Sequence, residues 1–181
     1  MKPEIATIVM AFSSDPIARW VWPDSAAYLE HCPRFIEAFG GKAFEHNTAY
    51  YAPEGGAALW LPPGVEPDQE AMAEIMQTTV DAKRQVEMDG FFEQMAQNHP
   101  TGPHWYLPVI GVDPPKQGQG IGSKLMRQAL ERCDRDGLPA YLESSNPRNI
   151  SLYERHGFKI VGKIQSGSSP EMFPMLREPI T

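Results

Sequence analysis

Seven consecutive residues in the second half of the chain have the spacing of a phosphate-binding loop. Gln117-Gly118-Gln119-Gly120-Ile121-Gly122-Ser123 places a glycine at every second position, between an apolar stretch and an amphipathic one. Glycine lets the backbone approach a ligand closely and adopt positive φ. The first turn of a helix presents unpaired N–H groups at the positive end of its dipole. Together these features predict a cradle for a pyrophosphate group.

The residue order within this loop distinguishes three kinds of phosphate site. A P-loop requires Gly-Lys-Ser or Gly-Lys-Thr, whereas the chain has Gly122-Ser123-Lys124. The dinucleotide fingerprint would need a residue like glycine at position 123, which is serine. The spacing matches Gln/Arg-x-x-Gly-x-Gly/Ala, and the loop therefore resembles the pyrophosphate signature of the GNAT acetyltransferase superfamily.

A second motif follows one expected strand later. Asn146 precedes Tyr153 by seven residues, and Gly157-Phe158 comes next, an arrangement that resembles the second GNAT signature. The resemblance covers roughly residues 105–176 and looks most like the puromycin N-acetyltransferase branch. It implies an α/β (α+β) fold, with a central mixed sheet of six or seven strands flanked by helices. Residues 1–181 would form one domain, with an acceptor-side half (1–100) and a coenzyme-binding and catalytic half (104–177).

The resemblance implies an enzyme of the acyltransferase class (EC 2.3.1) that transfers acetyl from acetyl-CoA to a primary amine of a small molecule or peptide. Transfer would be direct, within a ternary complex and without a metal. The residues expected at the coenzyme are Ile110, Gly111 and Val112, where a strand splays from its neighbour; Gln117, Gly118, Gln119, Gly120, Ile121, Gly122 and Ser123 in the loop; and Asn146, Asn149 and Tyr153. Asn149 stands where the family often has Ala. An equal alternative to a role at the coenzyme is therefore that Asn149 is only a polar residue in the first turns of the helix.

The resemblance assigns Tyr153 as the general acid that protonates the departing thiolate, and packing beside Phe158 is the alternative. A phenol with a pKa of about 10 can donate to a thiolate whose thiol has a pKa of about 8.5. The base that deprotonates the amine is left open among His104, Glu143 and a water relay. Aromatic residues of the first half either line an acceptor pocket or belong to the core: Trp20, Trp22, Phe35, Phe91 and Phe92.

Two other functional classes remain. A domain of the same fold could bind acyl-CoA as a sensor or regulatory domain without turnover, and a nucleotide-binding protein could use the glycine loop for phosphate. The presence of Tyr153 speaks against the first, and the order Gly122-Ser123-Lys124 speaks against the second.

Apolar periodicity and turn residues place the elements that must position these groups. Pro33 is expected to kink or split its helix, and Gly90 to break the long one. Strands are predicted over 5–12, 48–52, 57–61, 104–112, 138–143, 158–165 and 171–176; helices are predicted after Asp15-Pro16 and over 25–39, 68–98, 121–136 and 147–156.

Composition excludes several classes of protein. The 181 residues carry 16 Lys and Arg against 23 Asp and Glu, a net charge of −7, which argues against nucleic acid as a partner. No stretch approaches 18 apolar residues, so no membrane span is expected and the protein is predicted to be cytoplasmic. Cys32 and Cys133 are expected to be reduced, and no metal site is indicated. The expected partner is the amine acceptor; a homodimer is an open alternative.

Overall fold

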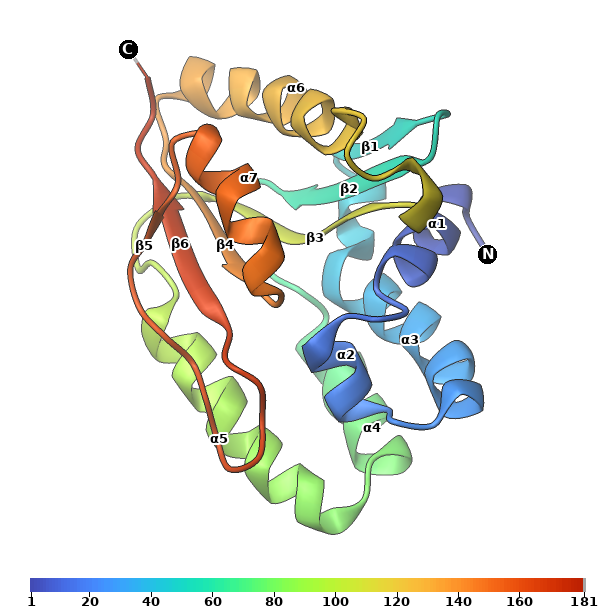
Figure 1. Ribbon diagram of the computed structural model, residues 1–181. Coiled ribbons are helices and arrows are strands. Elements are labelled where there is room, and N and C mark those ends of the chain that lie inside the picture. The colour runs from blue at the N-terminus through green and yellow to red at the C-terminus, as the bar shows by residue number, and fades with distance from the viewer. Residues whose placement is uncertain (181) are drawn as a thin grey trace.

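A six-stranded mixed sheet forms the centre of the protein in a computed structural model that describes residues 1–180 (Figure 1). The strands lie in the order β1-β2-β3-β4-β6-β5, and among them the pair β3–β4 is parallel while the other pairs are antiparallel. The expected mixed sheet is therefore confirmed, with six strands. Their bounds are β1 (Ala49–Ala52), β2 (Gly56–Leu61), β3 (Trp105–Val112), β4 (Ala140–Ser144), β5 (Lys159–Ile160) and β6 (Phe173–Arg177).

Helices cover both faces of this sheet, as Figure 1 shows with α6 and α7 above it and α4 and α5 below it. Side chains of β3 divide between the two faces of the sheet. Trp105 and Leu107 pack in the core under α6 and α7, while Tyr106 and Val109 pack in the core shared with α1, α3 and α4, so the alternation shifts by one residue at Pro108. The helices are α1 (Pro3–Ala11), α2 (Pro16–Val21), α3 (Ser25–Gly40), α4 (Gln69–Thr79), α5 (Ala82–Asn98), α6 (Ile121–Asp136) and α7 (Ile150–Arg155). No described helix is both long and apolar enough to span a membrane.

Residues with short polar side chains, or with none, set the helix ends. Asp15, Asp24, Asp68 and Asp81 each accept a hydrogen bond from a backbone N–H in the first turn of α2, α3, α4 and α5. Helix α6 ends at the left-handed Gly137, with φ 65°. The expected boundaries after Asp15-Pro16, Asp24 and Asp136 are therefore confirmed.

The strand predicted over 5–12 is wrong, because Pro3–Ala11 is the helix α1. Its β-branched residues favour a strand, but Ile5, Ile8 and Val9 share one helical face, and that face is buried. A Cβ at Gly111 of β3 would lie 2.6 Å from the Ala11 Cβ and 3.2 Å from the Ile8 Cα, so α1 packs directly on the glycine backbone. Tertiary contact decides the conformation of this short apolar run.

The predicted split at Pro33 and the predicted break at Gly90 are also wrong. Helix α3 continues through Pro33, and Leu29, four residues earlier, is exposed, so water can bond to the carbonyl group that loses its partner. The break expected at Gly90 lies instead at Val80, whose extended backbone separates α4 from α5. Gly90 is inside α5, and a Cβ there would lie 2.6 Å from the Ser166 Oγ, so the glycine makes room for a loop.

That loop joins β5 to β6 and replaces most of the strand predicted over 158–165. Only Lys159–Ile160 pairs as a strand among these residues, with a single bridge at Ile164. The loop runs along α5 (Figure 1), where Gln94 exchanges hydrogen bonds of 2.7 and 3.0 Å with the Gln165 backbone. The Ser168 hydroxyl donates to Glu87 and accepts from the Trp20 indole N–H. These hydrogen bonds attach the loop between β5 and β6 to α2 and α5.

Candidate functional site

The Gly-rich loop presents a run of unpaired backbone N–H groups. Gly118 and Gly120 have φ 76° and 82°, and a Cβ at either position would meet nothing within 4 Å. Within residues 1–180, the N–H groups of residues 118–123 donate no hydrogen bond, and they lie at the start of α6. Free donors at a helix N-terminus, with open space before them, fit a pyrophosphate group such as that of coenzyme A.

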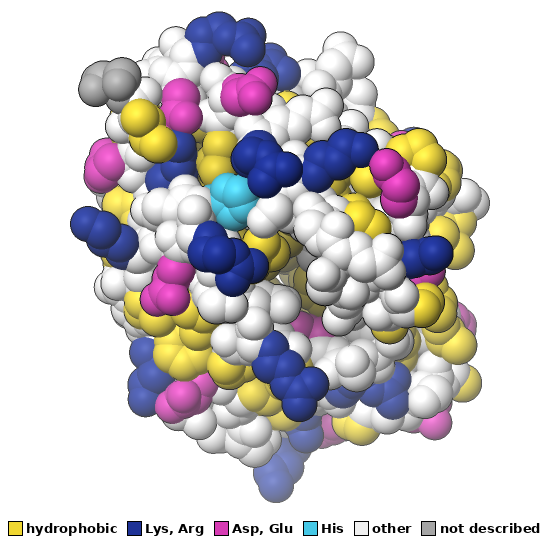
Figure 2. All heavy atoms as spheres, turned by 45° about the horizontal axis from the view of Figure 1, so that its top comes forward, with side chains coloured by type: hydrophobic (Ala, Val, Ile, Leu, Met, Phe, Trp, Pro, Cys, Tyr) yellow, Lys and Arg dark blue, Asp and Glu magenta, His cyan; other side chains and the backbone are white. Residues whose placement is uncertain are grey.

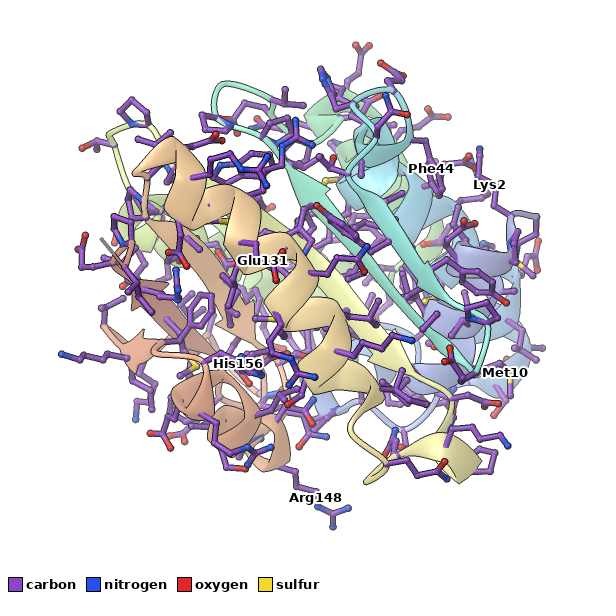
Figure 3. The ribbon with its side chains drawn as sticks, turned by 90° about the horizontal axis from the view of Figure 1, so that it is seen from above. Lys2, Met10, Phe44, Glu131, Arg148 and His156 are labelled. Atoms are coloured by element: carbon purple, nitrogen blue, oxygen red, sulfur yellow. The ribbon has the colours of Figure 1, made fainter. Side chains whose placement is uncertain are left out.

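Basic side chains surround this end of the molecule. Figure 2 shows Lys and Arg spread around a hollow in this face, and Figure 3 shows Arg148 pointing away from the body. Lys124 donates to Glu54 at 3.0 Å, so its charge is already paired. His156 lies beside α6 with its Nε2 3.0 Å from the Ser123 Oγ, and burial lowers its pKa. Lys and Arg side chains thus lie on this face although the chain as a whole is acidic, but Lys124 and His156 add no unpaired positive charge to it.

The strands β3 and β4 part just before the loop. They pair from Trp105–Leu107 to Ala140–Leu142, and the pairing then stops. The next residue of β3, Pro108, has no N–H to offer to a neighbour. A register shift in the β2–β3 pairing lies at the same level, since Leu59 faces Val109 whereas Leu61 faces Tyr106. Proline and bulge together explain why the sheet opens here.

A small cavity of about 120 Å³ occupies this opening, and we call it the strand cavity. Ile110 of β3, Glu143 of β4 and Tyr153 of α7 all line it, together with Pro108 and Asn149. Tyr153 is 6% exposed. Burial, and then the Asp15 carboxylate, raise its pKa, so the phenol remains protonated. The site therefore holds a proton donor where the two strands separate.

A second cavity, of about 670 Å³, lies between α4, α5 and the sheet, and we call it the helix cavity. Six side chains border both cavities, so one wall divides them. These shared residues are Phe39, Met76, Met88, Phe92, Met95 and Glu143. Among them Glu143 carries the only charge.

Glu143 is a buried carboxylate within a polar network. Its side chain is 4% exposed, and its Oε2 accepts a 2.8 Å hydrogen bond from the Tyr106 hydroxyl. Its Oε1 has no hydrogen-bond partner and lies 3.8 Å from the His99 Nδ1. Burial, and then Glu143, raise the pKa of Tyr106, so the phenol stays a donor. One carboxylate oxygen is thus fixed and the other is free to accept a proton.

The other candidate base, His104, borders neither cavity. Its Nδ1 lies 2.7 Å from the Gly102 carbonyl oxygen and its Nε2 lies 2.9 Å from the His99 Nε2. Burial lowers its pKa. Sequence analysis overlooked His99, which links His104 to Glu143 and lines the helix cavity. No local spacing could have revealed it, because His99 and Glu143 meet through the fold.

Asp15 is a second buried carboxylate at the strand cavity. Its Oδ1 accepts from the N–H groups of Ile17 and Ala18, and its Oδ2 accepts a 2.6 Å bond from the Ser145 hydroxyl. Burial raises its pKa despite these bonds. Because both of its oxygens are bonded, Asp15 ties α2 to the end of β4.

The other residues predicted for the coenzyme and acceptor sites lie at several places in the fold. Asn146 begins the short 3-10 turn Pro147–Asn149, and its Oδ1 accepts from the Arg148 N–H. Gly111 is covered on one side by α1, which gives the glycine a packing role as well. The five aromatic residues weighed for an acceptor pocket all line the strand cavity: Trp20, Trp22, Phe35, Phe91 and Phe92. Within the described chain, no three His, Cys, Asp or Glu side chains form a metal-binding group.

Comparisons with known proteins agree with this geometry. Residues 76–158 match the acetyltransferase (GNAT) family. An uncharacterized N-acetyltransferase of Schizosaccharomyces pombe is 40% identical over 80 residues, which are 42% of this chain and 32% of that protein. A mycothiol acetyltransferase of Saccharomonospora viridis is 28% identical over 181 residues, covering 85% of this chain and 53% of that one. The chain spans between 18% and 54% of the length of the first three curated relatives.

Solved structures extend the likeness to nearly the whole chain. A Corynebacterium glutamicum structure titled as histone acetyltransferase HPA2 and related acetyltransferase superposes with a TM-score of 0.65 at 25% identity, covering 98% of this chain and 90% of that one. Naa20 of Chaetomium thermophilum, solved with a bisubstrate analogue, shares the fold with a TM-score of 0.53 at 15% identity, covering 99% and 84%. Residues 76–158 thus match the GNAT acetyltransferase family, and nearly the whole chain shares the fold of a solved acetyltransferase structure.

Proposed function

We propose that the protein transfers acetyl from acetyl-CoA to the primary amine of a small molecule, by direct attack in a ternary complex. The observation that carries this proposal is the continuous arrangement of three parts. The first part is the set of unpaired amides at the start of α6. The second is the gap between β3 and β4, where Tyr153 lines the strand cavity. The third is the helix cavity, which shares Glu143 with the strand cavity. Residues 1–100 contribute most of the second cavity and residues 104–177 the coenzyme side.

The coenzyme supplies an activated acetyl thioester. The N–H groups of residues 118–123 would bind its pyrophosphate, and the unpaired stretch of β3 from Pro108 would flank its pantetheine arm as an added strand does. A bond forms between the amine nitrogen and the acetyl carbon while the carbon–sulfur bond breaks. Tyr153 would give its proton to the departing sulfur, since the raised pKa keeps the phenol protonated.

Glu143 is the base that the geometry favours. Its Oε1 has no hydrogen-bond partner and its side chain borders both cavities, and an amine must lose a proton before attack. His104 is separated from both cavities by His99, so it would act only through that residue. Glu143→Gln keeps the bond to Tyr106 and removes the charge, and we expect kcat to fall by about 10²–10⁴-fold. A larger loss in His104→Gln than in Glu143→Gln would assign the base to His104, and losses in neither would favour a water relay.

Coenzyme binding and turnover are tested separately. Thermal shift with acetyl-CoA, CoA, ATP and NAD should show stabilisation by both CoA species, and stabilisation by ATP or NAD alone would refute the proposal. A matched pair of variants locates the site: Gly118 and Gly64 both have positive φ and open space at Cβ. Gly118→Asp should weaken CoA binding about tenfold through charge repulsion, whereas Gly64→Asp should leave it unchanged.

Tyr153→Phe tests the chemistry. We expect kcat to fall at least tenfold with little change in the CoA dissociation constant, because only the proton donor is lost. Tyr51, which is 42% exposed on β1, provides the control Tyr51→Phe. An unchanged kcat in Tyr153→Phe would remove the acid role. CoA binding without acetylation of any amine would favour the acyl-CoA sensor.

A further inference from the structure

The apolar part of the helix cavity's wall is rich in methionine. Four methionines, Met72, Met76, Met88 and Met95, line it together with Phe39 and Phe92. Thioether side chains are apolar, flexible and polarisable, and they adapt to ligands of irregular shape. The volume of about 670 Å³ lies in the range of small-molecule sites, roughly 300–1,000 Å³. These walls suit the apolar body of a small organic molecule.

The polar groups of the same cavity carry one sign of charge. Glu66, Asp89 and Glu143 line it, and none of its described lining residues is Lys or Arg. The Glu143 side chain is 96% buried, and its Oε1 has no hydrogen-bond partner. A buried carboxylate oxygen left unpaired is costly unless a donor reaches it. Three carboxylates and an orphaned acceptor favour a cationic donor in the cavity.

We propose, on the basis of the acetyl transfer proposed above, that the helix cavity binds primary amines that combine one positive charge with an apolar body, such as arylalkylamines. The ammonium group would meet the free oxygen of Glu143, and the body would lie against the methionines. A substrate carboxylate would face Glu66 and Asp89 with no Lys or Arg to pair with it. A polyamine could pair its charges with the carboxylates, but it has no apolar body to lie against the methionines.

A matched series of ligands separates charge from apolar surface. 3-Phenylpropylamine has both features, homophenylalanine adds a carboxylate to the same amine, 3-phenylpropanol is its neutral analogue, and ethylamine lacks the ring. Spermidine adds charges without apolar surface. Calorimetry in excess CoA should show 3-phenylpropylamine binding at least tenfold more tightly than each of the others. Ethylamine and spermidine lose the burial of an aromatic group, which is worth about 1.5–3 kcal/mol, or roughly tenfold or more in affinity. 3-Phenylpropanol lacks the charge that would meet Glu143, and the carboxylate of homophenylalanine would face Glu66 and Asp89.

Two methionine variants place the ligand in the cavity. Met72 is half-buried at the cavity, whereas Met10 is 50% exposed on α1 and does not border it (Figure 3). Met72→Lys should reduce the affinity for 3-phenylpropylamine at least tenfold by adding a like charge to an apolar wall, with CoA binding unchanged. Met10→Lys should change neither affinity.

Each outcome decides the proposal. Equal or tighter binding of homophenylalanine, 3-phenylpropanol, ethylamine or spermidine would overturn it, as would no binding of 3-phenylpropylamine or equal effects of the two variants. The readout is binding, so it is distinct from acetyl transfer. Tight binding of 3-phenylpropylamine without CoA release from acetyl-CoA would refute the proposed reaction and still support the cavity's preference.

Discussion

Replacing Gly111 by alanine tests the packing of α1 on the sheet, the feature that overturned the predicted first strand. The new Cβ would lie 2.6 Å from the Ala11 Cβ and 3.2 Å from the Ile8 Cα. Carbon atoms prefer separations of about 3.5–4.0 Å, so α1 must move by about 1 Å. The second atom belongs to the helix backbone, which cannot turn aside as a side chain could.

The size of the effect follows from two opposing terms. Overpacking of this kind costs about 1–3 kcal/mol, and the close backbone contact puts Gly111→Ala in the upper half of that range. Loss of glycine's flexibility in a strand returns about 0.5–1 kcal/mol. The expected net loss is therefore about 1–2.5 kcal/mol, which for a chain of this size lowers Tm by roughly 2–10 °C.

Urea unfolding and calorimetry measure this loss, and Gly102→Ala is the control. A Cβ at Gly102 meets nothing within 4 Å and its φ is not positive, so its stability should change little. Adding Ala11→Gly to Gly111→Ala removes the closest contact, and the double-mutant cycle should show a coupling of about 1 kcal/mol. Wild-type stability in Gly111→Ala with no coupling to position 11 would show that α1 does not pack here.

Two further perturbations test stability through charge. Burial lowers the pKa of His104 and His156, so between about pH 7 and pH 5 the unfolded chain binds protons that the folded chain refuses. The free energy of unfolding should fall as pH falls through this window, and the double variant His104→Gln/His156→Gln should show a shallower slope; an equal slope would contradict this. Arg177, which is 4% exposed, makes two hydrogen bonds of 2.7 and 2.8 Å to Asp134 and holds the pKa of that carboxyl below its usual value. Asp134→Asn should lower the free energy of unfolding by about 1–3 kcal/mol at pH 7, because a buried guanidinium loses its charged partner. This difference in stability between wild type and variant should shrink below about pH 4, where Asp134 is protonated in the unfolded wild type. A difference that does not change with pH would rule out the charge as its source.

The second half of the chain was predictable because its signals are local. Gly120 and Gly137 bound α6 by their backbone conformation, and the apolar stripe between them has a clear helical period. The parting of β3 and β4 was inferred from resemblance alone, although Pro108 supplies a physical reason that was visible in the sequence.

The first half was less predictable because its conformation depends on distant contacts. The β-branched residues of 5–12 favour a strand, but in the structure they form a helix that buries Ile5, Ile8 and Val9 and packs on Gly111, about a hundred positions away. Asp81 caps the start of α5, so its residue type was a local signal that a helix begins there. The prediction placed the break at Gly90 instead, because glycine often interrupts a helix. The meeting of His99 with Glu143 depends on where α5 ends relative to β4, which no single segment specifies.

The loop between β5 and β6 limits how far the two halves of this protein can be exchanged as modules. Gln165 and Ser168 are bonded to Gln94 and Glu87 of α5, whose other side chains line the helix cavity. The matched family region ends at residue 158 and leaves this loop out. A chimera that transplants the first hundred residues onto another coenzyme-binding half must therefore carry residues 161–172 with them, or α5 loses its support. Sequence variation in α5 and in this loop should accordingly be read as one unit, although the two segments lie about 70 positions apart.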